Sequence, residues 1–460
     1  MDTERSVVPA AALASLSAAC AEVREADPAA DAVAGVVPSL VASPASTDEA
    51  SALLRAAAGH GLTVVPRGAG TGLGWGTPPS SCDLVVDMCR MNQVIEHAAG
   101  DLVARVQAGT TIGALASALG AAGQQLALDA PADATVGGVV ATGTAGPRRF
   151  RYGAARDLLI GITVVRADGV VAHSGGKVVK NVAGYDLGKL LSGSRGTLGL
   201  ITEATFRLHP VPAAEAWVTG EFGPPDRAGA ASAAASAVAS AARSALVPSA
   251  VELAWTGPPV VPRVGVLLEG TPSGVADRAD LMAELLAAAG ATPAVADSET
   301  PFRWWEQIPE SGPVGTVVRV TFWVRQLADV LGALAAAGAS AGVGPAVSGP
   351  AGAGVLYARL DPATGDGAAA RFIRDLRDRM LGVFGGSGDG SGLVRGGVAV
   401  LAAPAAVLAT AGPDAPVPGA DLMRAVKDQF DPQHRMFPGL MFPGPVFPVP
   451  MSPERPSGGG

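Results

Sequence analysis

Glycine occupies every second position in the run Arg67-Gly68-Ala69-Gly70-Thr71-Gly72-Leu73-Gly74-Trp75-Gly76. Glycine adopts positive φ without a Cβ clash. Alternating glycines therefore let successive backbone N–H groups turn inward and form a concave nest, which favours an anion such as phosphate or pyrophosphate. Glycines at this spacing also occur in tight loops that bind nothing. The run by itself is compatible with a phosphate nest or with a passive loop.

Two other phosphate motifs are excluded at this run. A dinucleotide fingerprint needs a third glycine three residues after its second, and Leu73 and Trp75 stand at those positions. Pro78 and Pro79 follow, so no helix is expected to begin here with its N-terminus on a phosphate. No Gly-Lys pair is followed by Ser or Thr, which excludes a P-loop. We therefore expect loop amides alone to hold any phosphate.

Composition narrows the class of protein. A chain of 460 residues is expected to form at least two domains. A net charge of −8 with no basic run argues against nucleic-acid binding. Cys20, Cys82 and Cys89 show no Cys-x-x-Cys spacing, which is typical of reduced thiols in the cytoplasm. The first residues lack a basic signal-peptide region, and no apolar run is long enough for a membrane span.

Local patterns predict the elements that position the glycine run. Ser46 and Glu49 form a capping box for a helix to about Ala58. A strand at Thr63–Val65 leads into the run. Residues 129–138 form a second flexible segment with hydroxyl and amide donors. The other expected elements are helices near Ala10–Glu25, Thr111–Ala122 and after Asp186, strands at Leu84–Asp87, Leu102–Gln107, Leu158–Val165 and Leu200–Leu208, a hairpin turn at Ala167–Gly169 and a loop at Gly193–Gly199.

Beyond Pro210 and Pro212 a pattern of elements occurs twice. Each copy has the order β-α-β-β-α-β, the first from about residue 217 to 296 and the second from 316 to 402. Two such units could merge into one large antiparallel sheet with helices on one face. A helix at Asp421–Phe430 follows. The proline-rich residues 436–450 are expected to run extended.

Four passages carry a resemblance to a known family: residues 65–72, 131–138, 175–187 and 193–205. They resemble the FAD-binding domain of the vanillyl-alcohol oxidase family, also called the PCMH type. The sequences of residues 180–187 and 193–205 are most similar to those of the FAD-binding subunits of bacterial glycolate oxidases.

The resemblance implies an α+β fold in five parts. These are an N-terminal arm (1–32), a PCMH-type FAD-binding domain (33–212), an α+β cap domain with a large antiparallel sheet (213–404), a C-terminal segment that returns to the FAD-binding domain (405–450) and a disordered tail (451–460).

The resemblance also implies which residues bind FAD. The Arg67–Leu73 amides would hold the pyrophosphate, and the remaining positions would follow the ribityl chain and the flavin. The implied cofactor-binding residues are Arg67, Gly68, Ala69, Gly70, Thr71, Gly72, Leu73, Pro131, Thr135, Gly137, Gly138, Tyr152, Gly153, Gly199 and Ile201. Turn geometry alone is the alternative explanation for Gly137, Gly138 and Gly199.

Three departures from the family qualify these expectations. Relatives with covalent flavin often carry a histidine in the glycine run, where Thr71 stands here, so noncovalent FAD is expected. Metal-dependent relatives have closely spaced cap histidines, and this chain has none, so no metal is expected. Phe437-Pro438-Gly439 replaces the family's Asn-Pro-Gly.

Oxidation of a 2-hydroxy acid needs a base for the hydroxyl proton and a cation for the carboxylate. His434 could be the base or a surface histidine, and Arg319 could hold a carboxylate or pair with an acid within the fold. Lys180 and Asn181 could serve the flavin or an interface, and Trp304 and Trp305 a partner or the core. The catalytic residues stay unassigned.

Two classes of function follow. The first is an FAD-dependent oxidoreductase subunit of a glycolate oxidase complex, with a small 2-hydroxy acid as substrate, a sister flavin subunit and an iron–sulfur subunit as partners. The second is a non-catalytic, FAD-stabilised assembly subunit. A free-standing D-lactate-type dehydrogenase is the other enzymatic alternative. The expected location is cytoplasmic, with at most a peripheral contact with the inner face of the cell membrane through partners.

Overall fold

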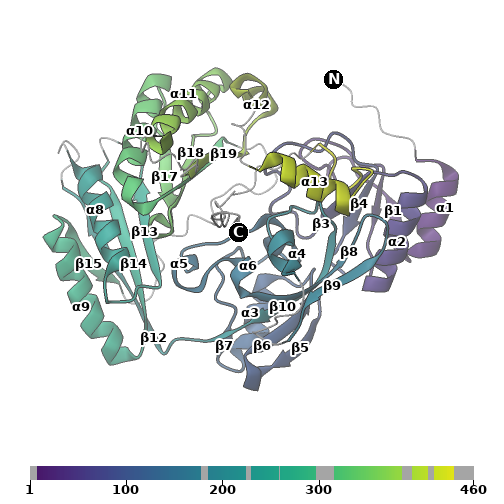
Figure 1. Ribbon diagram of the computed structural model, residues 1–460, viewed down its shortest axis with the longest axis horizontal. Coiled ribbons are helices and arrows are strands. Elements are labelled where there is room, and N and C mark those ends of the chain that lie inside the picture. The colour runs from purple at the N-terminus through teal and green to yellow at the C-terminus, as the bar shows by residue number, and fades with distance from the viewer. Residues whose placement is uncertain are drawn as a thin grey trace, which may run out of the picture.

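The computed structural model describes residues 8–177, 185–223, 229–257, 260–296, 315–385, 396–412 and 419–439. Figure 1 shows two halves that meet at the centre of the molecule. The first extends from α1 to β11, and the second from β12 to α12. Helix α13 lies against the first half, so the chain returns after completing the second.

The first half contains a four-stranded sheet that ends at the glycine run. Its order is β1 (Val23–Glu25), β2 (Leu40–Ala42), β4 (Leu84–Asp87) and β3 (Val64–Arg67), with parallel pairing of β2, β4 and β3. Helix α2 (Thr47–Gly59) begins with the predicted capping box, since Ser46 Oγ accepts from Glu49 N at 3.1 Å. Glu49 in turn accepts from Ala45 N at 2.6 Å.

Two local predictions in this half were incomplete. The helix expected over Ala10–Glu25 is α1 (Ala10–Ala19), because Cys20 is extended and Val23–Glu25 pairs with β2 as a strand. Residues 1–32 thus contribute an edge strand to this sheet. The strand β5 (Val94–Ala98) was not expected.

A five-stranded antiparallel sheet completes the first half. Its order is β5, β6 (Val103–Gln107), β10 (Leu200–Arg207), β8 (Leu159–Val165) and β9 (Val171–Gly175). The short pair β7 (Gln124–Gln125) and β11 (His209–Pro210) lies beside it. The helices of this half are α3 (Ile112–Gly120), α4 (Val136–Thr142), α5 (Arg149–Tyr152), α6 (Ala155–Leu158) and α7 (Leu187–Leu191), with a 3-10 turn η1 (Ala99–Asp101).

The second half is one eight-stranded antiparallel sheet built from the two predicted repeats. The order of its strands is β15 (Thr292–Ala296), β12 (Ala214–Glu221), β14 (Arg263–Gly270), β13 (Ala250–Trp255), β17 (Ala346–Gly349), β18 (Val355–Arg359), β16 (Val317–Phe322) and β19 (Gly396–Ala402). The two repeats join where β13 pairs with β17. The predicted α+β architecture with a tandem split-βαβ sheet is confirmed.

Side-chain alternation gives this sheet two faces. Val251 and Leu253 of β13 pack under the helices, whereas Ala250 packs on the opposite face with Trp217. The covering helices α8 (Ala230–Arg243), α9 (Pro272–Ala288), α10 (Leu327–Ala341) and α11 (Asp366–Gly385) lie on the outer side in Figure 1. The opposite face therefore turns toward the first half. Helix α12 (Ala405–Ala411) adds Val407 and Ala411 to the helix-side core.

The C-terminus returns to the first half, as the fold class predicted. Helix α13 (Ala420–Phe430) packs Val426 and Phe430 against that half. The chain after α13 then forms two backbone hydrogen bonds with Val64 of β3. Val64 N donates to Arg435 O at 2.8 Å, and Phe437 N donates to Val64 O at 2.8 Å. The C-terminal segment around Met436 thus lies directly beside the strand that leads into the glycine run.

Candidate functional site

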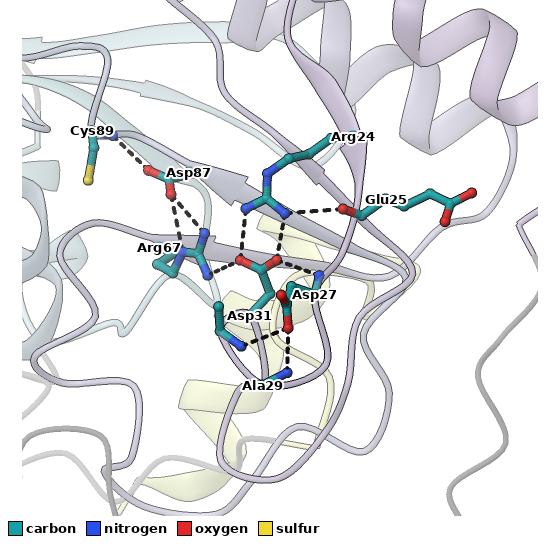
Figure 2. Close-up of polar contacts among 9 residues, drawn as sticks. Arg24, Glu25, Asp27, Ala29, Asp31, Arg67, Asp87 and Cys89 are labelled. Carbon is teal, nitrogen blue, oxygen red and sulfur yellow. Dashed lines mark hydrogen bonds and ion pairs between the residues drawn. The ribbon is translucent and has the colours of Figure 1, made fainter.

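Buried ion pairs hold the end of β3 in place. Arg67 donates to Asp31 Oδ1 at 2.9 Å and to Asp87 Oδ2 at 2.8 Å, and Arg24 also donates to Asp31 (Figure 2). The Asp31 side chain is 2% exposed. The hydrogen bond from Arg24 is the largest cause of a pKa for Asp31 well below the usual range. The charge of Arg67 is therefore neutralised by two acids of the fold.

The amides after Arg67 are free. Gly68, Ala69, Gly70, Thr71 and Gly72 donate no backbone hydrogen bond to any acceptor in the described part of the chain. Gly70 has φ +87°, a conformation that favours glycine, and Leu73 N closes the turn on Gly70 O at 3.0 Å. Five consecutive unpaired donors are the feature expected of an anion nest rather than of a passive loop.

The segment around Thr135 differs from the prediction, because its last residues begin helix α4. Thr135 is the N-cap, and its Oγ1 accepts from Gly138 N at 3.3 Å. The next two amides are also paired: Val136 N donates to Thr110 O at 2.8 Å and Gly137 N to Ala108 O at 2.7 Å. A helix end therefore lies beside the glycine run, but its first donors are already used. The free donors belong to the run.

The two segments approach so closely that only glycine fits between them. A Cβ added at Gly68 would lie 2.0 Å from Thr135 Oγ1, and one at Gly72 would lie 2.8 Å from Thr142 Cγ2. Gly137 meets the same limit, since its Cβ would lie 2.7 Å from Ala108 Cβ. Close packing of backbone therefore accounts for these glycines in addition to turn geometry.

A cavity with about 720 Å³ of empty space, part of it open to solvent, lies between these segments. Twelve of the fifteen predicted cofactor-binding residues line it: Arg67, Gly68, Ala69, Gly70, Thr71, Gly72, Leu73, Thr135, Gly137, Gly138, Gly199 and Ile201. The prediction did not include other lining residues, namely Pro66, Met88, Ala108, Ala141, Thr142, Arg195, Gly196, Leu200 and Phe437. Phe437, from the substituted Asn-Pro-Gly motif, thus reaches the cavity wall.

Pro131, Tyr152 and Gly153 do not line this cavity. Pro131 O accepts from Ala134 N at 3.1 Å in a turn. The Tyr152 hydroxyl donates to Glu269 Oε2 in the second half at 2.8 Å, and its ring lies 4.8 Å from that of His209. Burial and this hydrogen bond raise the pKa of Tyr152 to about 12. Tyr152 thus connects the two halves of the molecule.

A second cavity lies between the two halves and α13, with about 1180 Å³ of empty space that is partly open. Arg149 and Arg156 of the first half and Arg319 and Tyr357 of the cap sheet line it. Arg319 and Tyr357 are paired across β16 and β18. Nε and Nη2 of Arg319 have no hydrogen-bond partner within the described chain, and burial lowers its pKa. A buried guanidinium without an acid partner is a candidate binding group for an anion.

The two cavities share a wall. Thr142 and Arg195 line the first cavity, and their chain neighbours Gly143 and Ser194 line the second. The end of α4 and the Gly193–Gly199 loop therefore separate a nest of amides from a chamber lined by arginines.

The sequence also suggested His434, Lys180, Asn181, Trp304 and Trp305 as functional residues. His434 is exposed and pairs with Asp428 at 2.8 Å, and it lines neither cavity. Lys180, Asn181, Trp304 and Trp305 are outside the described residues. Among the residues that are described, no group of His, Cys, Asp and Glu could hold a metal ion, and no helix is long and apolar enough to cross a membrane.

Sequence comparisons identify the first half. The model of the FAD binding domain family matches residues 38–175. The glycolate oxidase subunit GlcD of Bacillus subtilis is 40% identical over 182 residues, which are 38% of this chain and 38% of that protein. A D-lactate dehydrogenase of Archaeoglobus fulgidus is 39% identical over 172 residues, 37% of this chain and 39% of that one. The matched regions thus span about two fifths of these relatives.

Solved structures extend the likeness of the fold to nearly the whole chain. An alkyldihydroxyacetonephosphate synthase superposes with a TM-score of 0.66 at 18% identity, over 95% of this chain and 87% of that one. A p-cresol methylhydroxylase with substrate bound gives a TM-score of 0.65 at 16% identity, over 93% and 95% of the two chains. The chain therefore contains an FAD-binding domain within a two-part fold that these structures share, and FAD is its cofactor.

Proposed function

We propose that this chain is an FAD-dependent oxidoreductase subunit that acts on small 2-hydroxy acids, with glycolate as its substrate within a glycolate oxidase complex. The observation that carries the proposal is the shared wall between the amide nest and the chamber that contains Arg319. The partners would be a sister flavin subunit and an iron–sulfur subunit, to which the electrons pass. Any contact with the membrane is assigned to those partners.

The residues of the first cavity fit FAD. Five free amides at Gly68–Gly72 match the oxygens of a diphosphate, and the close approach at Gly68 keeps the cavity narrow there. None of the lining residues within the described chain is a histidine, cysteine or tyrosine, which supports noncovalent binding. Bound FAD supplies the acceptor for the hydride that leaves the substrate.

The residues of the second cavity fit a carboxylate. A guanidinium can donate two parallel hydrogen bonds to a carboxylate, and Arg319 lines this cavity without an acid partner in the described fold. Leu422, Met423 and Val426 of α13 line the same cavity and limit the access of water to it. Arg319 thus binds and orients the acid beside the wall of the FAD cavity.

A second candidate function rests on what the described lining of this chamber lacks. The described lining of the second cavity includes no histidine, aspartate or glutamate that could take the hydroxyl proton of the substrate. This favours a chain that relays electrons, or stabilises the assembly, while a sister subunit oxidises the acid. The similarity to D-lactate dehydrogenases keeps D-lactate as the alternative substrate.

Anaerobic mixing with glycolate or D-lactate tests these functions through loss of the oxidised flavin absorption. Bleaching of the isolated holoprotein supports the oxidoreductase, and the acid that bleaches it faster identifies the substrate. Bleaching of this chain's flavin only in the complete complex supports the relay. A flavin that stays oxidised in the active complex supports the assembly role and contradicts the proposal.

For Arg319 we predict that Arg319→Lys raises KM for the acid by roughly 10- to 100-fold, because a bidentate charged contact is lost. FAD content is expected to stay unchanged, since Arg319 does not line the FAD cavity. Arg243→Gln, an exposed residue at the end of α8 on the outer face of the cap, is the matched control. An unchanged KM in Arg319→Lys would contradict the assigned role.

A further inference from the structure

The charges around the FAD cavity do not balance. Among the described lining residues there are two cations, Arg67 and Arg195, and no carboxylate. Arg67 is neutralised by Asp31 and Asp87. Arg195 has no ion pair or side-chain hydrogen bond within the described chain. One positive charge at this cavity therefore lacks an anion.

Packing fixes the position of Arg195 relative to the nest. Arg195 N donates to Ala141 O at 2.7 Å, which attaches its loop to the end of α4. The next residue, Gly196, packs so tightly on Pro66 that an added Cβ would lie 3.0 Å from Pro66 Cγ. Pro66 directly precedes Arg67, after which the free amides begin at Gly68. The Arg195 loop and the nest are thus adjacent walls of one cavity.

Keeping an arginine at this position is unfavourable for the protein without ligand. Arg195 has φ +56°, in the left-handed region that L-residues rarely adopt. Burial, together with the nearby charge of Arg319, lowers its pKa to about 10, so it remains a cation at neutral pH. A strained, desolvated and unpaired cation is typical of a binding group whose partner is the ligand.

We propose that Arg195 binds the diphosphate of FAD, as the cation that complements the free amides of Gly68–Gly72. The proposal rests on FAD occupying this cavity. The amides supply aligned partial charges and Arg195 a full one, so together they offset the charge of two phosphate groups. The cationic character of the Gly193–Gly199 loop comes from this single residue.

The affinity of the apoprotein for FAD, measured by titration, tests the proposal. We expect Arg195→Gln to raise the Kd by roughly 10- to 100-fold, because a charged hydrogen bond to the diphosphate is lost. Arg195→Lys keeps the charge and should raise it less. The Kd of Arg195→Gln should also respond less to salt than that of the wild type, since one ion pair fewer is screened.

Two further measurements separate this role from others. At saturating FAD, the midpoint potential of the flavin in Arg195→Gln should equal that of the wild type, whereas a contact with the flavin ring would shift it. Arg195→Gly should raise the melting temperature of the apoprotein, because it removes an unpaired charge and a strained φ, while it weakens FAD binding. A residue with a merely structural role would not change these two properties in opposite directions.

The control is Arg243→Gln, which changes the net charge equally on the outer face of the cap. An unchanged Kd in Arg195→Gln, or a shifted potential, overturns the role of Arg195 but leaves the proposed function intact. A folded wild-type protein that binds no FAD overturns both.

Discussion

At the scale of single residues, two glycines of the same run serve different physical needs. Gly70 is required for its backbone conformation, with φ +87° and open space around its Cβ position apart from Leu73. Gly68 has an ordinary φ and is required for space, because Thr135 occupies the position that its side chain would need. Thr135 cannot move aside easily, since it is 2% exposed and caps α4.

We predict that Gly68→Ala lowers FAD affinity and destabilises the protein by roughly 1–3 kcal/mol, the range for overpacking a tight site. FAD titration and urea unfolding of the apoprotein measure the two effects. Gly120→Ala at the end of α3 is the matched control, because nothing lies within 4 Å of its Cβ position. Equal behaviour of the two variants would show that the Gly68–Thr135 contact is unimportant.

At the scale of elements, the returning C-terminal segment stabilises the loop that contains Arg195. Lys427 of α13 donates to Thr197 O at 2.7 Å, to Met436 O at 2.9 Å and to Asp431 Oδ2 at 2.6 Å. Lys427 and Asp431 are 9% and 1% exposed. One ammonium thus joins α13, the C-terminal segment around Met436 and the Gly193–Gly199 loop.

We predict that Lys427→Met destabilises the protein by roughly 3–5 kcal/mol, because it leaves Asp431 buried without its cation. Adding Asp431→Asn should recover part of this loss. Urea unfolding measures both variants, and Arg424→Ala is the control, since its ion pair with Asp421 is exposed and contributes little. If Lys427→Met lowers the free energy of unfolding no more than Arg424→Ala does, the buried ion pair does not hold the C-terminal segment in place.

At the scale of the whole molecule, hydrogen bonds join the cap to the FAD-binding half. Gly76 N, at the end of the glycine run, donates to Leu401 O of β19. On the other side, Tyr152 donates to Glu269 of β14, a residue that is 3% exposed. The position of the second cavity depends on these contacts, because its lining comes from both halves.

We predict that Tyr152→Phe destabilises the protein at neutral pH by about 1 kcal/mol, since a buried carboxylate loses its donor. The wild-type pKa of about 12 lies above the unfolded value of about 10, so the folded state holds this proton more tightly. The contribution of the Tyr152 hydroxyl to folding stability is therefore complete below pH 10 and is lost as the pH rises toward 12.

The difference in stability between wild type and Tyr152→Phe, followed by chemical unfolding across this pH range, tests the prediction. It should shrink as the pH rises. Tyr185→Phe is the control, because Tyr185 is 91% exposed. A difference that stays constant with pH would contradict the linkage to Tyr152.

The sequence alone was sufficient where the physical cause is local. Alternating glycines determine a run whose amides turn inward, Ser46 and Glu49 determine the start of α2, and strand and helix periods determine the tandem repeats of the cap. The resemblance carried by residues 65–72, 131–138, 175–187 and 193–205 gave the cofactor, and twelve of the residues that it implies line the first cavity.

Only the tertiary structure decided which donors and charges remain free. The amides of α4 are used because Ala108 and Thr110, distant in sequence, present their carbonyls to them. The positive charge of Arg67 is offset because Asp31 and Asp87 form ion pairs with it. Within the described chain no acid pairs with Arg195 or Arg319, because of how loops and sheets far apart in the sequence pack together. Whether a polar group is already satisfied depends on all its neighbours in space, and a linear sequence does not specify them.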